Sequence, residues 1–163
     1  MSRLNSFIRR ITAQRDCLDR AFAVIGDLPG AVLELGLGNG RTYNHIREGC
    51  PGREVFVFER KVSAHPADIP DAEHLIEGDL FETLPGAQSR IGQKAALAHI
   101  DIGSGRPERD SRIAAFISAE LPALMADTAV ILSDQELTLP DWATEDLPEG
   151  VAPGRYFFYS RGI

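Results

Sequence analysis

Three glycines alternate over a short stretch of the chain and could bring a ligand against the backbone. Gly36, Gly38 and Gly40 lie in the run AVLELGLGNGRT, which spans Ala31–Thr42. Glycine has no Cβ, so it adopts positive φ readily and allows a ligand close to the main chain. The dinucleotide fingerprint is G-x-G-x-x-G, and this chain has Arg41 in place of the third glycine. The spacing therefore disfavours pyrophosphate binding and a dinucleotide-dependent oxidoreductase.

Acidic side chains follow three later apolar runs. Glu59 comes after EVFVF, Asp79 after HLIEG, and Asp101 after AALAHI. A carboxylate has two acceptor oxygens and can hold both hydroxyls of a vicinal diol, such as a ribose. Glu77 competes with Asp79 as the acid at its position. The alternative for Glu59 is a solvated charge at a strand end, and the alternative for Asp79 is a turn residue that caps its own backbone.

Hydrophobic periodicity predicts the elements that would position these residues. Leu4, Ile8, Ile11, Leu18 and Ile25 recur at the spacing of an amphipathic helix. Short apolar and β-branched runs are typical of strands. The expected strands cover residues 31–35, 54–58, 74–77, 95–100, 128–132 and 155–160. The expected helices cover residues 3–26, 41–48 and 110–125, and residues 80–91 form a loop or a short helix.

The alternation of strands and helices predicts an α/β fold. Crossover helices imply a mostly parallel sheet of six or seven strands with helices on both faces. We expect one domain over residues 1–163, with an N-terminal helix over 1–28 and an α/β core over 29–163. Ligands of such sheets bind beyond the carboxyl ends of the strands. The glycine loop and the strand-end acids should therefore meet at one edge.

The glycine segment and the acids after it resemble the class I S-adenosylmethionine-dependent methyltransferases. Glu34–Gly40 (ELGLGNG) is similar to motif I of that family, and Glu59 and the step Gly78-Asp79 follow in the family's order. The resemblance runs from about residue 30 to about residue 134. It implies a three-layer Rossmann-like methyltransferase fold that binds S-adenosyl-L-methionine.

The resemblance also implies roles for individual residues. Glu59 would accept hydrogen bonds from the ribose hydroxyls, and Asp79 from the adenine amino group. Leu80 or Phe81 would lie against the adenine ring. Asp101 would bind the amino group of the cofactor or face the methyl acceptor. The implied cofactor-binding residues are Glu34, Gly36, Leu37, Gly38, Asn39, Gly40, Thr42, Glu59, Arg60, Gly78, Asp79, Leu80, Asp101 and Ile102.

The catalytic groups are less well defined. His99, Asp101 and His65 are candidates for a general base, although a lone strand histidine is more often packed and hydrogen-bonded. Asp101 and Asp134 stand at strand ends that are similar to the metal positions of catechol-type O-methyltransferases, but Gln135 replaces that family's Asn. Two alternatives stay open. One is a metal-dependent enzyme of that type, and the other is a non-catalytic relative that acts through association.

Composition limits the partners. The 163 residues carry a formal net charge of −7, which argues against a large nucleic-acid surface. We expect a small-molecule acceptor, for which Phe7, Tyr43 and Trp142 could shape a pocket or merely serve packing. The first residues contain no apolar run, and the chain has no 18-residue apolar stretch, so we expect no signal peptide, no membrane contact and a cytoplasmic location. The short segment after the fifth strand predicts a trimmed C-terminal end, and self-association as a homo-oligomer would be one way to complete the pocket.

Overall fold

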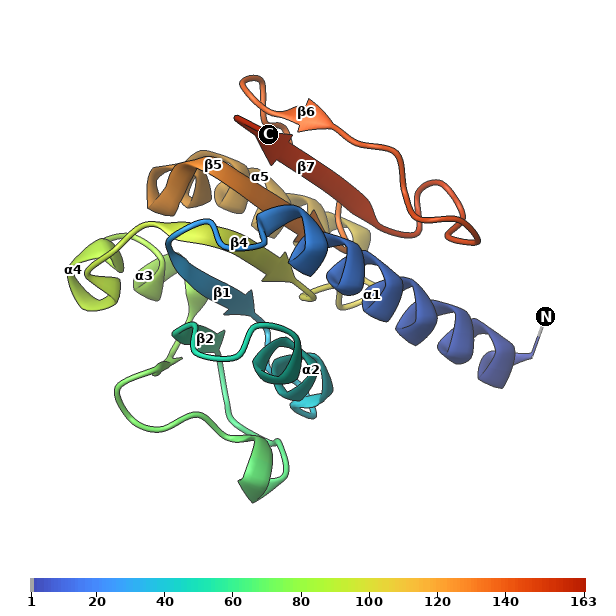
Figure 1. Ribbon diagram of the computed structural model, residues 1–163. Helices are drawn as coiled ribbons and strands as arrows, with labels where there is room; N and C mark the ends of the chain where they lie inside the picture. The colour runs from blue at the N-terminus through green and yellow to red at the C-terminus, as the bar shows by residue number, and fades with distance from the viewer. Residues whose placement is uncertain (1) are drawn as a thin grey trace.

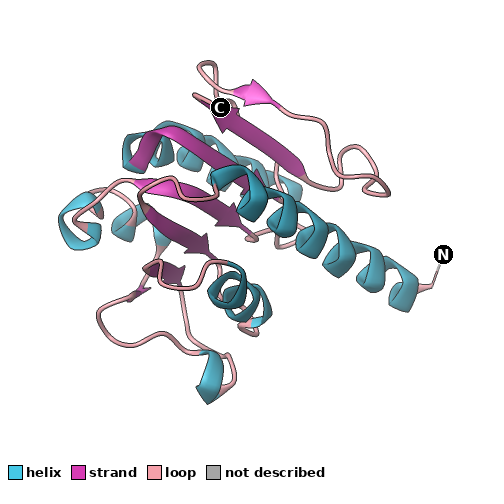
Figure 2. Ribbon diagram, viewed as in Figure 1, coloured by secondary structure: helices cyan, strands magenta, loops and turns pink. Residues whose placement is uncertain are grey.

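A seven-stranded sheet forms the middle layer of the molecule (Figures 1 and 2). The computed structural model describes residues 2–163. The strand order is β3-β2-β1-β4-β5-β7-β6, in which β1 to β5 are parallel and β7 is antiparallel to both neighbours. The strands are β1 (Ala31–Leu35), β2 (Val55–Glu59), β3 (Leu75–Glu77), β4 (Ala95–Ile100), β5 (Met125–Ser133), β6 (Ala143–Thr144) and β7 (Phe157–Arg161). The helices are α1 (Arg3–Ile25), α2 (Arg41–Gly49), η1 (Pro66–Asp68), α3 (Leu80–Thr83), α4 (Gln88–Ile91), α5 (Pro107–Glu120) and η2 (Leu121–Leu124). The expected α/β fold with a mostly parallel sheet is confirmed.

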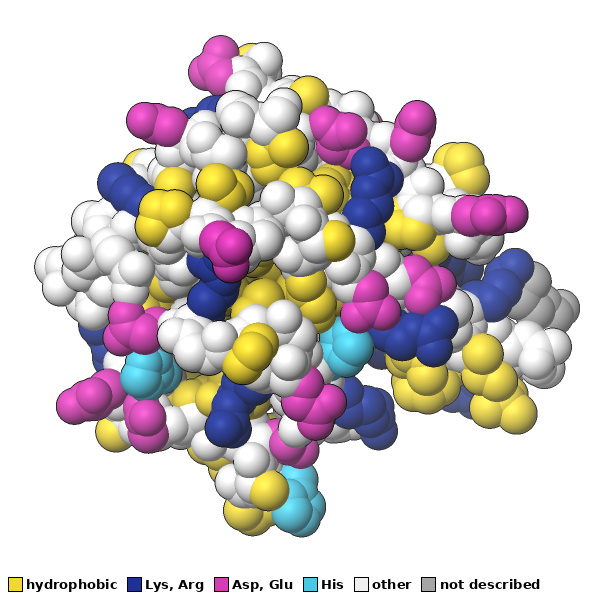
Figure 3. Space-filling model, in the orientation of Figure 1, with side chains coloured by type: hydrophobic (Ala, Val, Ile, Leu, Met, Phe, Trp, Pro, Cys, Tyr) yellow, Lys and Arg dark blue, Asp and Glu magenta, His cyan; other side chains and the backbone are white. Residues whose placement is uncertain are grey.

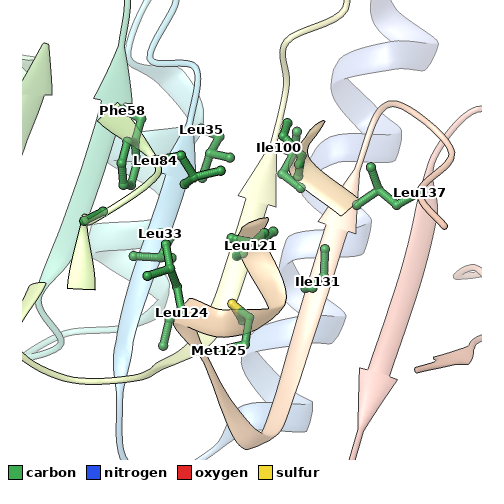
Figure 4. Close-up of a cluster of buried hydrophobic side chains, with 14 of the residues drawn as sticks. Leu33, Leu35, Phe58, Leu84, Ile100, Leu121, Leu124, Met125, Ile131 and Leu137 are labelled. Atoms are coloured by element: carbon green, nitrogen blue, oxygen red, sulfur yellow. The ribbon is translucent and has the colours of Figure 1, made fainter. Parts of the chain in front are cut away.

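Helices cover both faces of the sheet because successive side chains of a strand point to opposite sides. Val32 of β1 packs toward α1 and α2, together with Leu18 and Ile46. Leu33, the next residue, packs on the opposite face with Ile117 of α5. Figure 4 shows the apolar layer on this second face. Burial of the two layers supplies the main driving force that holds helices and sheet together.

The carboxyl end of β1 lies level with the ends of its neighbours. Leu35 pairs with Phe58 of β2 on one side and with Ile100 of β4 on the other. The chain passes from β1 to β2 and β3 in one direction and then returns to β4 on the far side of β1. The strand order therefore reverses beside β1, which is where open α/β sheets bind ligands.

Helix α1 has a buried part and an exposed part. Its start is capped by the Ser2 hydroxyl, which accepts a hydrogen bond from the Asn5 N–H at 3.1 Å. The part around Leu18 is buried against the sheet. The first turns extend beyond the sheet (Figure 1) and leave Phe7 and Ile8 exposed. Within residues 2–163, no helix has the length and apolar character needed to cross a membrane.

The predicted helix over residues 110–125 is shorter in the structure and begins earlier. It starts at Pro107, which suits a first helical turn because that position needs no N–H donor. It ends at Glu120, and the 3-10 turn η2 that contains Pro122 follows. Proline inside a helix removes a backbone hydrogen bond, which explains the stop. β5 then begins at Met125, three residues before the predicted strand.

The C-terminal end keeps an antiparallel finish but lacks a helix after β5 in the part of the chain that the structure describes. β7 covers Phe157–Arg161, where a strand over 155–160 is expected. β6, over Ala143–Thr144, completes the sheet. Two residues leave no periodicity in a sequence, so β6 could not be predicted.

Candidate functional site

The glycine loop brings β1 against the loop that follows β4. Gly36, Gly38 and Gly40 all have positive φ, at 98°, 51° and 83°. A Cβ on Gly36 would lie 2.4 Å from the carbonyl oxygen of Asp101, which no side chain tolerates. A Cβ on Gly38 would meet no atom within 4 Å. The first glycine is thus required by packing, whereas the second leaves open space for a ligand.

Glu59 at the end of β2 fixes the glycine loop from the other side. Its Oε2 accepts hydrogen bonds from the N–H groups of Leu37 (2.8 Å) and Gly38 (3.2 Å). Its Oε1 accepts from the N–H of Lys61 at 3.0 Å. Each carboxylate oxygen has two lone pairs, so one lone pair of Oε1 is left to accept a hydrogen bond from a ligand.

The third strand end carries an aspartate and two apolar residues. Asp79 precedes α3, and its Oδ1 accepts a hydrogen bond from the Phe81 N–H at 3.0 Å. Asp79 therefore caps its own helix and also lines a cavity with Leu80 and Phe81. Phe81 packs on Phe116 with ring centroids 4.5 Å apart. The competing acid Glu77 is exposed and accepts from the backbone of Val62 at 3.3 Å instead.

Asp101 follows β4 and is held by helix α1. Its Oδ2 accepts a hydrogen bond from the Gln14 side-chain amide at 2.6 Å. Its Oδ1 lies 3.4 Å from a guanidinium nitrogen of Arg10. About a fifth of the side chain stays exposed (22%), so the carboxylate is positioned but accessible.

These strand ends surround one cavity of about 710 Å³. Binding pockets of small molecules and cofactors typically have volumes of about 300–1,000 Å³. Nine of the predicted cofactor-binding residues line it, namely Gly36, Gly38, Glu59, Arg60, Gly78, Asp79, Leu80, Asp101 and Ile102. A second cavity of about 470 Å³ adjoins it, and the two share Gly38, Asp101 and Gly103. The predicted residues Leu37, Asn39 and Thr42 line the second cavity.

Two of the predicted cofactor-binding residues, Glu34 and Gly40, and two of the candidate bases, His65 and His99, line neither cavity. Gly40 serves close packing, since a Cβ there would lie 2.4 Å from the Cβ of Asp68. His65 caps η1 and accepts from the Ala67 N–H at 3.2 Å. Both residues therefore shape the segment around the glycine loop without facing the cavities.

Glu34 and His99 belong to a buried polar cluster below the glycine loop. Glu34 accepts hydrogen bonds from Nδ1 of His99 at 2.7 Å and from the Thr42 hydroxyl at 2.5 Å. The Tyr156 hydroxyl lies 2.5 Å from Nε2 of His99. Burial lowers the pKa of His99, but the Glu34 carboxylate beside it, together with the charges of Asp101 and Asp134, outweighs this effect, so the net shift of the pKa is upward. Both side chains have no exposed surface, so a substrate cannot reach them.

Asp134 at the end of β5 accepts hydrogen bonds from backbone N–H groups of the loop after β4. Its Oδ2 accepts from the Gly103 N–H at 2.8 Å and its Oδ1 from the Ile102 N–H at 3.3 Å. Burial and the nearby Asp101 charge raise its pKa. Among the residues that the structure describes, no group of three or more His, Cys, Asp or Glu side chains is arranged to hold a metal ion. Both carboxylate oxygens of Asp134 already accept hydrogen bonds from the loop after β4.

Of the three aromatic residues considered for an acceptor pocket, two are in the core. Tyr43 and Trp142 are buried in the two apolar layers. Phe7 is 40% exposed on the protruding part of α1. Only Phe7 therefore remains available to a ligand.

Residues of α1 and of the first turns of α5 were missed by sequence reasoning. The first cavity is also lined by Glu108, Arg109 and Arg112 of α5. Gln14 and Arg10 reach Asp101 from α1. Gln14 interrupts the apolar stripe of α1, and this interruption was the one signal available in the sequence.

Comparisons with known proteins agree with this geometry. A family model described as S-adenosyl-L-methionine methyltransferase matches residues 1–161. The crystal structure of an S-adenosyl-L-methionine methyltransferase from Silicibacter pomeroyi DSS-3 is 42% identical in sequence, with a TM-score of 0.92, and the match covers 99% of each chain. The chain belongs to this family. It is an S-adenosyl-L-methionine-dependent methyltransferase, and its cofactor is S-adenosyl-L-methionine. The family assignment favours an enzyme over a non-catalytic relative.

More distant structures share the fold alone. A putative methyltransferase from Escherichia coli is 14% identical, with a TM-score of 0.57, and the match covers 90% of this chain and 86% of that one. An rRNA methyltransferase from Streptomyces viridochromogenes is 12% identical, with a TM-score of 0.58, and the match covers 91% and 82% of the two chains. No curated protein matches the sequence. These relationships leave the methyl acceptor open.

The residues of the first cavity fit the cofactor. A carboxylate at Glu59 suits a ribose diol, and the apolar side chains of Leu80 and Phe81 suit the flat face of a purine. The space above Gly38 would be filled by any larger side chain. The chemistry of the lining therefore agrees with the cofactor that the family uses.

Proposed function

We propose that the protein transfers a methyl group from S-adenosyl-L-methionine in the first cavity to a small molecule in the second. The observation that carries this proposal is the junction of the two cavities at Gly38, Asp101 and Gly103. A donor and an acceptor that occupy adjoining cavities meet at one point. The second cavity lies between α1 and the start of α2. Its volume of about 470 Å³ suits a small acceptor.

Each strand end has a part in holding the cofactor. Glu59 would accept a hydrogen bond from a ribose hydroxyl through the one lone pair of Oε1 that the N–H groups of Leu37, Gly38 and Lys61 leave free. Asp79 accepts from the adenine amino group, while Leu80 and Phe81 cover the ring. These assignments are supported by the joint lining of one cavity and by the order of the residues in the family's motifs.

Asp101 stands where the two cavities meet and has two uses. Its charge attracts the amino group of the cofactor, and its position beside the second cavity lets it accept a proton from an acceptor that keeps one until reaction. Gln14 holds the carboxylate at 2.6 Å and so fixes its direction.

The bound cofactor supplies an activated methyl group on a sulfonium. The protein's own contribution is alignment: the glycine loop and the β4 loop would hold the two reactants next to each other. Methyl transfer of this kind needs little more than orientation of the two reactants.

Purified protein should be incubated with methyl-labelled S-adenosyl-L-methionine and a panel of hydroxy, amino, carboxy and thiol metabolites. We expect label in at least one small molecule, with equal release of S-adenosylhomocysteine. Gly38→Val serves as the control in which the donor site is blocked. Label that appears in added RNA or protein, and in no small molecule, would contradict the proposal.

A further inference from the structure

The charged side chains that line the second cavity are mainly basic, although the chain as a whole is acidic. The chain has a formal net charge of −7. The cavity nevertheless has Arg10, Arg15 and Arg41 in its lining, against Asp101 as the acid among its lining residues. A cavity lined by one sign of charge concentrates ligands of the opposite sign.

Two of the basic groups in the lining are already paired. The Arg15 guanidinium donates to Asp16 at 2.8 and 2.9 Å, and Nε2 of His45 lies 2.7 Å from Asp19. The charges of Arg15 and Asp16 neutralise each other, and the His45 ring is held by Asp19. Neither Arg15 nor His45 therefore explains a preference for an anion.

Arg10 and Arg41 remain. Arg10 makes one long contact with Asp101 at 3.4 Å, and 45% of its side chain is exposed. Arg41 has no acidic partner within 4.0 Å among residues 2–163. Both guanidinium groups lie over the ring of Phe7, with their carbons 6.0 and 5.9 Å from its centroid.

Two like charges around one ring repel each other, and a bound anion between them relieves that repulsion. Guanidinium groups form paired hydrogen bonds to carboxylate and phosphate oxygens. Figure 3 shows basic and hydrophobic side chains side by side at the protruding end of α1, which carries Arg10 and Phe7. The rim of the cavity thus combines cations with an apolar surface.

We propose that the methyl acceptor carries a carboxylate or phosphate group, which Arg10 and Arg41 bind in the second cavity. The inference rests on the proposed function, because it takes the second cavity as the acceptor site. The acceptor's anionic group lies at the rim between α1 and α2, and its nucleophilic atom points inward to Asp101. Phe7 contacts the apolar body of the molecule between these ends.

The test uses the full chain saturated with S-adenosylhomocysteine and a matched pair of probes. Benzoate and benzamide have the same shape, but only benzoate is charged. We expect saturable calorimetric binding of benzoate that is at least about tenfold tighter than that of benzamide, the factor expected for a charge-assisted hydrogen bond. Inorganic phosphate, titrated in the same way, distinguishes a phosphate acceptor from a carboxylate acceptor by which anion binds more tightly.

Variants locate the binding to the two arginines. Arg41→Gln and Arg10→Gln should each weaken binding of the preferred anion by about tenfold. Arg9→Gln is the matched control, because Arg9 is the neighbour of Arg10 and lines a different cavity. It should leave anion binding unchanged.

Three outcomes would overturn the inference. The first outcome is that benzoate and benzamide bind equally and phosphate does not bind. The second is that neither benzoate nor phosphate binds saturably. Either outcome would show that the cavity does not select an anion. A third outcome is that Arg41→Gln weakens S-adenosylhomocysteine but not 5′-methylthioadenosine, which lacks the amino-acid end. That result would assign the arginines to the cofactor's own carboxylate. If wild-type protein failed to bind S-adenosylhomocysteine at all, the proposed function itself would fail, which separates the two failures.

Discussion

His99 and Asp101 lie two residues apart at the end of β4, yet their surroundings differ completely. His99 has no exposed surface and is hydrogen-bonded to Glu34 and Tyr156 on the face covered by α1 and α2. Asp101 lies one step past the strand, is 22% exposed and lines both cavities. The end of β4 thus carries His99, which forms a closed polar pair with Glu34 of β1, and Asp101, an open acid that can contact ligands. Two polar residues that are close in sequence can therefore differ completely, one buried in a structural pair and the other open to ligands.

The largest expected effect is on the closed pair. Glu34→Ala leaves the buried His99 ring without its carboxylate, and breaking a buried ion pair destabilises a protein by about 3–5 kcal/mol. Urea unfolding measures this loss. Asp101→Ala should change the free energy of unfolding by only about 1 kcal/mol, because it removes hydrogen bonds at a partly solvated site. Similar losses for the two variants would erase the distinction between the closed and the open residue.

The next effect concerns the glycine loop. Glu59→Gln puts an amide in place of a carboxylate that accepts hydrogen bonds from the Leu37 and Gly38 N–H groups and, by our proposal, from the ribose. We expect S-adenosylhomocysteine to bind roughly 10–100-fold more weakly, measured by calorimetry. Glu77→Gln, one strand away and outside both cavities, is the control. Unchanged affinity in Glu59→Gln would remove Glu59 from the binding site.

A smaller effect should separate the two uses of Asp101. If its charge attracts the amino group of the cofactor, Asp101→Asn weakens S-adenosylhomocysteine about tenfold and leaves 5′-methylthioadenosine unchanged. The dissociation constants of the two ligands, measured side by side, give the result. Equal weakening of both would mean that the substitution disturbs the loop and not a contact with the amino-acid end.

The smallest effect is a pH dependence of stability. The folded state raises the pKa of His99, so the stabilising contribution of its charged form is fully present below the unfolded value of about 6.5. This contribution is lost as the pH rises through the raised pKa of the folded state. Unfolding midpoints of wild type should therefore fall over that range, relative to His99→Gln. Parallel curves for the two proteins would mean that His99 does not titrate differently in the folded state.

The sequence predicted the strands next to the site better than the helices around it. Ala31–Leu35 and Ala95–Ile100 are strands at the expected residues, since each is a short apolar run closed by a polar or glycine turn. The contribution of α5 to the first cavity was missed. Charged residues such as Glu108 and Arg112 are common at the start of a helix, and their types do not indicate that they line a cavity. The role of a strand residue depends on the face of the sheet to which its side chain points. What covers that face is decided by tertiary packing, which a single sequence does not show.

The role of Glu34 in the buried polar cluster also could not be predicted from the sequence. Glu34 precedes the glycines as in the family motif, and the resemblance implies contact with the cofactor. In the structure its carboxylate binds His99 and Thr42 and does not line either cavity. Glu34 and His99 are 65 residues apart, and they meet only because β1 and β4 pair in register. Only the pairing of the strands reveals that contact.

Calorimetric titration of S-adenosylhomocysteine into wild type and Gly38→Val tests most directly whether the glycine loop holds the cofactor in the first cavity. A Cβ at Gly38 meets no protein atom within 4 Å, and the residue lines both cavities, so a side chain there occupies ligand space. Because the φ of 51° strains a β-branched residue, Gly38→Asn, whose side chain tolerates this backbone conformation, is measured beside Gly38→Val and should also fail to bind. We expect saturable binding to wild type and none to Gly38→Val, while the variant keeps a cooperative unfolding transition. Equal affinity in the two proteins, with the variant folded, would contradict the placement of the cofactor at this loop.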